Sequence, residues 1–164
     1  MNKSKKNQKG FSLIELLAVI VIMGILMLVG IPAVKRYVTN SKKDVYVNAV
    51  QTYVKATKTA FENEDLTCSD TLKGNYFIYF SQLDSVMEDK AKSPFTKKGM
   101  NGMIIFSVND GKISDDGIKV AVRDDSSIGF ARCAYVSVTR KSLAKYVSTG
   151  EIYADYGYTE CKVR

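Results

Sequence analysis

The sequence predicts an α+β protein: a long N-terminal α-helix, apolar in its first half and amphipathic in its second, packed on a C-terminal antiparallel β-sheet domain. Three observations support this fold class. Residues 16–34 carry no charged or strongly polar side chain, residues 35–62 contain no Gly or Pro, and residues 63–164 combine short β-rich runs with turn signals. The 164 residues suffice for one such domain and an additional helix.

The first ten residues, MNKSKKNQKG, are strongly basic and contain no acid. Their four lysines account for four of the seven net positive charges, which leaves +3 on the remaining chain. A charge of that size is ordinary for a soluble domain. The basic composition therefore does not by itself indicate a nucleic-acid partner.

An apolar run of nineteen residues, 16–34, follows this basic segment. A helix that crosses a membrane needs about 20 such residues. The run is too long for a secretory signal, and no Ala-x-Ala cleavage site follows it. The basic start places the N-terminus in the cytoplasm, although Lys35 and Arg36 on the far side oppose this orientation. Hydropathy alone thus predicts a single-pass anchor with an outer domain.

Glu15 lies at the very start of this apolar run. An ionised carboxylate in hydrocarbon costs at least about 2–3 kcal/mol, so an acid in such a segment points to a functional role. The simplest alternative is an interfacial side chain that reaches the membrane surface and has no special role.

The stretch KGFSLIELL, residues 9–17, resembles the prepilin processing site of the type IV pilin superfamily, which includes type IV pilins and the pseudopilins of secretion and competence machines. The family pattern is a basic leader that ends in Gly, then Phe, then an acid at the fifth position after the cleavage site, then a long apolar helix. Gly10, Phe11 and Glu15 match these positions. The resemblance covers only the N-terminal part of the chain, and the remainder matches no particular member.

This resemblance implies that a membrane-embedded prepilin peptidase cuts after Gly10 and leaves Phe11 as the new N-terminus, usually N-methylated. Subunits then wait in the cytoplasmic membrane with the N-terminus inside. An inner-membrane assembly platform moves them into an extracellular helical filament. Residues 1–10 would be a leader peptide and residues 11–34 a transmembrane and filament-core helix.

In such a filament Glu15 has a partner. A charge in an apolar core is tolerated only when it is paired, and the free α-amine of Phe11 is a cation one helical turn away. In an array of identical helices, Glu15 of one subunit can meet the Phe11 amine of its neighbour and so set the axial register. We therefore predict that Glu15 is an assembly residue rather than a catalytic one.

Three residues interrupt the helical pattern of the apolar run: Gly24, Gly30 and Pro32. Pro32 stands where the pilin family's kink-forming proline is expected. It removes a backbone hydrogen bond, and together with the two glycines it is predicted to let the helix bend or extend inside a filament. The alternative is that these residues are simply tolerated, as they are in many membrane helices.

Residues 35–62 are predicted to continue the same helix. Apolar side chains recur at helical spacing and charged side chains occupy the other faces, as in a helix with one buried stripe. The stripe consists of Val50, Val54, Thr57 and Phe61. A continuous helix over residues 11–62 would be about 78 Å long at 1.5 Å per residue.

Residues 63–164 are predicted to form a globular α+β head. We expect a short helix within residues 76–92 and another in SLAKYVSTG. Strands are expected at residues 103–108, where an Asn-Asp-Gly hairpin turn follows, at 118–122, at 130–139, and within EIYADYGYTECKV. In the third of these strands, Ala134, Val136 and Val138 should share one face. Consecutive strands joined by short turns give an antiparallel sheet.

Three cysteines, Cys68, Cys133 and Cys161, allow three single disulfide pairings or three free thiols. The sequence alone does not choose among them. The pilin resemblance favours a bridge between Cys133 and Cys161, because pilins often close a C-terminal loop in this way.

The sequence offers little for catalysis. It contains no histidine, and therefore neither the commonest general base nor the commonest metal ligand. No glycine-rich phosphate loop occurs, and the acids of residues 109–116 do not match a calcium-binding EF-hand. We expect no enzymatic activity, no cofactor and no metal.

A basic patch would suit a filament that takes up DNA, because phosphates need cationic contacts. The candidate residues are Lys97, Lys98, Arg140, Lys141 and Lys145. Acids are scattered near them in sequence, which favours a mixed solvated surface and makes a nucleic-acid partner the less favoured expectation.

The sequence thus predicts a structural subunit of a type IV pilus that serves adhesion, motility or surface aggregation. Its partners would be copies of itself, the peptidase, the assembly platform and, before assembly, the membrane. The alternative is a pseudopilin of a type II-like secretion machine or a DNA-uptake (competence) machine, which shares the same N-terminus. A weaker alternative is an unprocessed, single-pass binding module.

Overall fold

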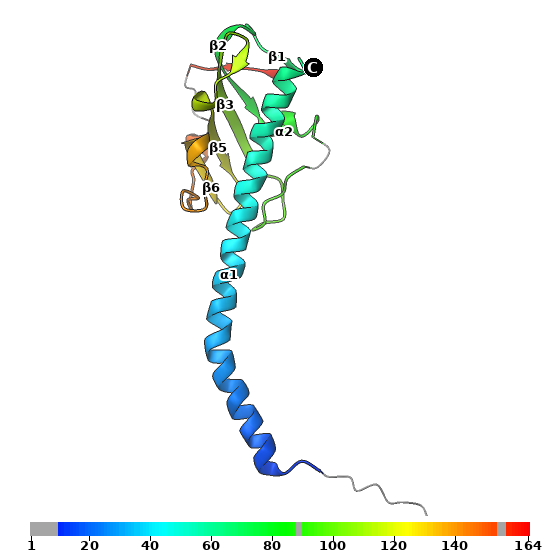
Figure 1. Ribbon diagram of the computed structural model, residues 1–164. Coiled ribbons are helices and arrows are strands. Elements are labelled where there is room, and N and C mark those ends of the chain that lie inside the picture. The colour runs from blue at the N-terminus through cyan, green and yellow to red at the C-terminus, as the bar shows by residue number, and fades with distance from the viewer. Residues whose placement is uncertain (1–9, 88–89, 154–156) are drawn as a thin grey trace, which may run out of the picture. The chain divides into compact units, whose positions relative to one another are not determined.

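The computed structural model describes residues 10–87, 90–153 and 157–164, so most of the predicted leader, residues 1–10, lies outside the described residues. The chain divides into two units, Met1–Thr39 and Asn40–Arg164. Helix α1, Leu13–Glu62, begins in the first unit and ends in the second (Figure 1). Its 50 residues end at the position that the sequence predicted.

The second half of α1 packs one face on the head domain, as its apolar spacing predicted. Val50, Val54 and Thr57 are buried, and Phe61 is half-buried. Tyr46 is fully buried on the same face, and its hydroxyl donates to the carbonyl of Ile128 at 2.8 Å. Burial is the main cause that raises the pKa of Tyr46 far above its usual value, so this phenol stays protonated as a donor.

The head contains a mixed but mainly antiparallel sheet with the strand order β6-β5-β3-β2-β7. Neighbouring strands are antiparallel except for β2 and β7, which are parallel. The strands are β2 (Lys73–Tyr79), β3 (Asn101–Asn109), β5 (Lys119–Arg123), β6 (Gly129–Ala134) and β7 (Thr159–Glu160). A short strand, β4 (Lys112–Ile113), forms the predicted hairpin with β3 through Asp110 and Gly111.

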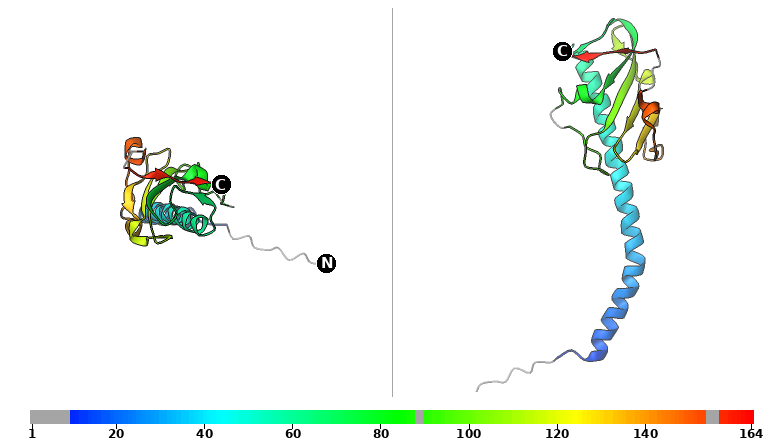
Figure 2. Two further views of the ribbon diagram at one scale, coloured as in Figure 1. Left: turned by 90° about the horizontal axis from the view of Figure 1, so that it is seen from above. Right: turned by 180° about the vertical axis from the view of Figure 1, so that it is seen from behind.

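The central strand β3 is buried on both faces, which explains its continuous apolar sequence. Ile104, Phe106 and Val108 belong to the main core, which also contains the buried stripe of α1. Met103 and Ile105 point to the other face, where Val147 and Ile152 cover them. Figures 1 and 2 show the part of α1 that belongs to this unit, residues 40–62, running along one face of the sheet.

In the described part of the head, the remaining helical segments are short: α2 (Phe80–Leu83), η1 (Asp115–Gly117), η2 (Tyr135–Ser137) and α3 (Thr149–Tyr153). The short helix expected within residues 76–92 is α2, and residues 76–79 before it belong to strand β2, which pairs with β3 and with β7. Two predictions need correction here. The helix expected in SLAKYVSTG, residues 142–150, begins only at Thr149, because Ala144 and Val147 form backbone hydrogen bonds with Gly129 and Ser127 instead. The strand expected at 130–139 ends at Ala134, so Val136 is 74% exposed while Val138 is buried.

The predicted disulfide between Cys133 and Cys161 is wrong. Cys161 is bonded to Cys68, and Cys133 is a free, half-buried thiol whose pKa is raised by burial. The physical reason is strand pairing. Strand β8 (Lys162–Val163) pairs with β1 (Leu66–Thr67) directly after α1, which brings the cysteines next to these strands together (Figure 2, right view).

Candidate assembly site

The N-terminal part of α1 is apolar and exposed on every side. Within the described residues, α1 is the one helix long and apolar enough to cross a membrane, by length and composition. Seventeen large apolar side chains between Phe11 and Val34 are exposed, and Phe11 itself is 83% exposed. An apolar surface of this extent marks a contact with a membrane or with other protein chains.

Glu15 closes a reciprocal cap at the start of this helix. The backbone N–H and the hydroxyl of Ser12 donate to Glu15 Oε2 at 2.8 and 2.9 Å, and the Glu15 N–H donates to Ser12 Oγ at 3.3 Å. Ser12 directly precedes Leu13, the first helical residue, so Glu15 occupies the third helical position. This arrangement is a capping box, which satisfies backbone donors that lack partners at a helix start.

Phe11 and Glu15 therefore lie close together at one end of α1, because Phe11 is bonded to the residue that Glu15 caps. A cation at the N-terminus of a helix is unfavourable beside the positive end of the helix dipole, and a carboxylate in the first turn offsets it. Gly10 is exposed, and no atom lies within 4 Å of the position that a Cβ would take there.

The residues predicted to bend the helix lie on its exposed surface, and α1 continues through Pro32. A Cβ added at Gly24 or at Gly30 would meet no atom within 4 Å, so nothing within the subunit requires glycine at either position. That Pro32 and the two glycines let the helix bend or extend inside a filament stays a prediction.

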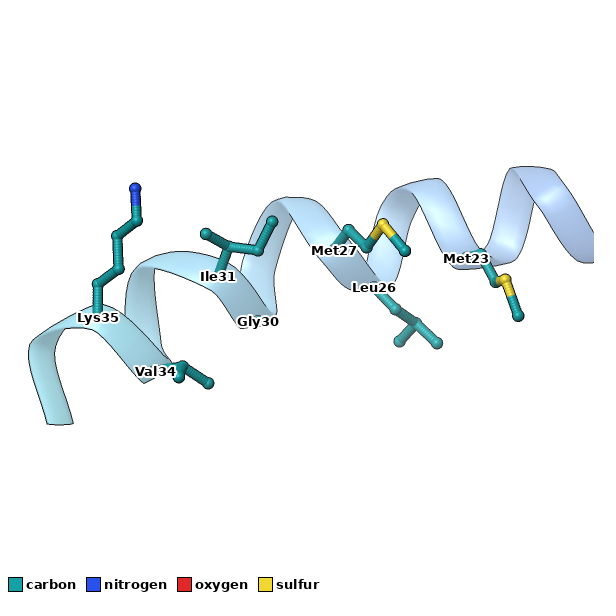
Figure 3. Close-up of a pocket in the computed structure, with 7 residues that line it drawn as sticks. All are labelled: Met23, Leu26, Met27, Gly30, Ile31, Val34 and Lys35. Carbon is teal, nitrogen blue, oxygen red and sulfur yellow. The ribbon is translucent and has the colours of Figure 1, made fainter. Parts of the chain in front are cut away.

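Gly30 leaves a gap in a row of apolar side chains. Figure 3 shows Leu26 and Val34 on one side of the helix, with Gly30 between them, and Met27 and Ile31 on another. The resulting shallow groove has a volume of about 470 Å³. Small residues let helices approach closely, and such gaps receive side chains of a neighbouring helix.

The sequence analysis singled out Phe11 and Glu15 but missed Ser12. The signal was present, because a Ser-x-x-Glu pattern directly before an apolar run is typical of a capping box. Ser12 matters because its hydrogen bonds give Glu15 a structural role within one subunit. An experiment on assembly has to separate this capping role from any role of Glu15 between subunits.

Comparisons with known proteins agree with these features. Residues 5–31 match the family model described as the prokaryotic N-terminal methylation motif. Two fimbrial proteins of Pseudomonas aeruginosa are each 32% identical to this chain over 120 residues, which cover 71% of the chain and 77% of each relative. No solved structure matches significantly. The match to the fimbrial proteins spans most of both chains, and the methylation motif lies at the start of an apolar helix, so this chain belongs to the type IV pilin family.

Proposed function

We propose that this pilin is cut after Gly10, methylated on the amine of Phe11, and polymerised into an extracellular type IV pilus. Residues 1–10 would be the leader, residues 11–34 the membrane anchor and later the filament core, residues 35–62 the continuation of the helix, and residues 63–164 the head. Pilins are structural subunits rather than enzymes. Prepilin peptidase and an inner-membrane assembly platform would be the partners, and the cytoplasmic membrane the starting location.

The observation that carries this proposal is a carboxylate at the start of a fully exposed apolar helix. Lipid tails are as apolar as the side chains of this helix, so leaving the membrane for a filament core gains little from hydrophobic transfer. Specific order must then come from packing and from polar pairs. Glu15 and the Phe11 amine of the next subunit supply such a pair, and an unpaired charge in the same core would be strongly unfavourable.

The capping box allows the two roles of Glu15 to be separated. Glutamine also closes a capping box, but it carries no charge. Glu15→Gln should therefore keep the helix start and lose the intersubunit ion pair, whereas Ser12→Ala should weaken the cap and keep the charge. We expect filament yield after shearing to fall about 100-fold or more in Glu15→Gln and Glu15→Ala, because removing one partner of a buried ion pair costs about 3–5 kcal/mol. In Ser12→Ala the yield should fall less than about 5-fold, because losing a helix cap costs only about 1 kcal/mol.

Wild-type yield from Glu15→Gln would overturn the register role and leave Glu15 as a helix cap only. Intact-mass and N-terminal peptide mass spectrometry on every variant is the control, because a defect in cleavage after Gly10 would also lower the yield. The wild-type chain should begin at Phe11 and carry one added methyl group. A chain that still begins at Met1 in cells with an active prepilin peptidase would contradict the proposal as a whole.

Two observations in cells separate a pilus from the alternative, a pseudopilus. Long surface filaments that contain this subunit would support the pilus. Loss of secretion or of DNA uptake in a deletion strain that never made surface filaments would support a pseudopilin of a secretion or competence machine.

A further inference from the structure

A strained, exposed tyrosine lies at one end of the head. Tyr146 is 84% exposed and has a φ of 65°, a left-handed conformation that is rare for a bulky residue without a structural or functional reason. Its neighbours hold it in place. Ala144 exchanges two backbone hydrogen bonds with Gly129, at 3.0 and 3.1 Å, and the Val147 N–H donates to the Ser127 carbonyl at 2.9 Å. The loop therefore presents an aromatic ring to solvent from a fixed backbone.

This loop, residues 140–146, is also basic. Lys141 and Lys145 are exposed, and neither forms a salt bridge with a residue in the described part of the chain. Arg140 is paired with Asp44 at 3.2 Å. The loop thus combines a fixed aromatic side chain with two cations that are available to an acidic partner.

A groove of about 370 Å³ lies beside Phe61 and has the complementary chemistry. Its apolar walls come from Phe61, Leu66 and Leu72, and Leu72 is 68% exposed. Glu62 and Glu64 line it as well and are exposed, against one lining cation, Arg164. We call this feature the Phe61 groove. An aromatic ring flanked by lysines fits an apolar groove flanked by glutamates.

The 140–146 loop and the Phe61 groove lie at opposite ends of the head, so one subunit cannot join them to each other. The loop is bridged to Gly129, which pairs with Arg123, and Arg123 pairs with Asn101 at the start of β3. The groove includes Gly111, which directly follows the other end of β3. Strand β3 separates these ends by about 27 Å at 3.3–3.4 Å per residue. Figure 1 shows the β3–β4 hairpin at the upper end of the sheet and the orange segment before α3 at the lower end.

Two complementary surfaces at opposite ends of one molecule make a head-to-tail contact, which propagates a filament instead of closing a dimer. We propose that Tyr146 of one head inserts into the Phe61 groove of a second copy, with Lys141 and Lys145 beside Glu62 and Glu64. This inference rests on the proposed polymerisation, and it assigns a second interface, between heads, in addition to the helical core.

The test uses filaments assembled from a mixture of unlabelled and ¹⁵N-labelled full-length subunits. A zero-length carbodiimide joins amines to carboxylates that are in direct contact. Mass spectrometry of the digested filaments should find peptides that join Lys145 or Lys141 to Glu62 or Glu64, each with one light and one heavy half. Cross-linked filaments that contain no such mixed pairs would overturn the proposal.

A charge exchange provides the second readout. Lys145→Glu and Glu64→Lys should each lower filament yield about fivefold, and the double variant should restore it to within about twofold of wild type, because opposite charges again face each other. Tyr146→Ser should lower the yield as well. Lys90→Glu and Val136→Ser change an exposed lysine and an exposed apolar residue outside both surfaces, and they should leave the yield unchanged.

The outcomes separate this inference from the proposed function. Normal filaments from both single charge variants, combined with loss of filaments in Glu15→Gln, would overturn the head contact and leave the polymerisation intact. Absence of filaments from wild-type subunits would overturn both.

Discussion

At the scale of single residues, the same four-residue pattern occurs twice in different surroundings. Ser148 and Glu151 repeat the arrangement of Ser12 and Glu15: the Ser148 N–H donates to Glu151 Oε2 at 2.6 Å, and the Glu151 N–H donates to Ser148 Oγ at 3.3 Å. The second box begins α3 in the head, outside the apolar part of α1. It shows what a capping carboxylate does when no filament core is involved.

The pKa of Glu151 lies below its usual range, because the Ser148 N–H and then the Ser148 hydroxyl donate to the ionised carboxylate. A lowered folded-state pKa means that the cap is fully effective above the unfolded pKa and is lost as the pH falls through the folded one. A carboxyl ¹³C titration of the full chain in detergent should give a midpoint below that of a model peptide. An ordinary midpoint would contradict the hydrogen bonds at this cap.

At the scale of elements, the sequence predicts best where a period extends over many residues. The buried stripe of α1 and its end at Glu62 follow from helical spacing without Gly or Pro, and β5 follows from the alternation of Ile118, Val120 and Val122, all buried. Residues 76–79 are a short apolar and aromatic run, which fits a strand or a helix equally well. Only its partners, β3 and β7, make it a strand, and local sequence does not contain them.

The candidate site could likewise be predicted only where its sequence signal is local. Glu15, Phe11 and Gly10 are recognisable because the pattern is local, and even the missed Ser12 had a local signal. The Cys68–Cys161 bridge depends on the pairing of β1 with β8, two strands of two residues each. So short a pairing has no periodic signal, and the bridge could not be predicted without the fold.

The groove at Gly30 leads to a prediction about the helix as an element of assembly. Gly30→Leu should leave the helix intact in detergent, or slightly more stable, because Gly costs about 1 kcal/mol relative to good helix formers and because a Cβ there meets nothing within 4 Å. The added side chain would fill the gap between Leu26 and Val34 and keep a neighbouring helix away. Circular dichroism should show unchanged helicity, and filament yield should fall.

Val29→Leu is the matched control for this variant, since it enlarges an exposed side chain next to Gly30 that does not line the groove. Equal filament yields from Gly30→Leu and wild type would show that no neighbouring helix uses the gap.

At the scale of the whole molecule, the head is closed by a connection between segments that are distant in the chain. The bridge from Cys68 to Cys161 spans 93 residues and so encloses the whole sheet of the head. It reinforces a two-stranded sheet, β1 with β8, of a size that is marginally stable on its own. The Arg164 N–H also donates to the Asp65 carbonyl at 2.9 Å beside it. Covalent closure of a long loop therefore holds the C-terminal strand against the end of α1.

Replacing both bridged cysteines, Cys68→Ser with Cys161→Ser, should lower the free energy of unfolding of the head by about 2–5 kcal/mol, because the unfolded chain regains the entropy of a long open loop. Urea unfolding of the full chain in detergent, followed by tyrosine fluorescence, measures the change. Reduced wild type should have the same urea midpoint as the double variant. Cys133→Ser should have a urea midpoint near that of wild type, since Cys133 is a free thiol. A double variant with the wild-type urea midpoint would mean that strand pairing and core packing alone hold the C-terminal strand, and the bridge would then have no role in the stability of the head.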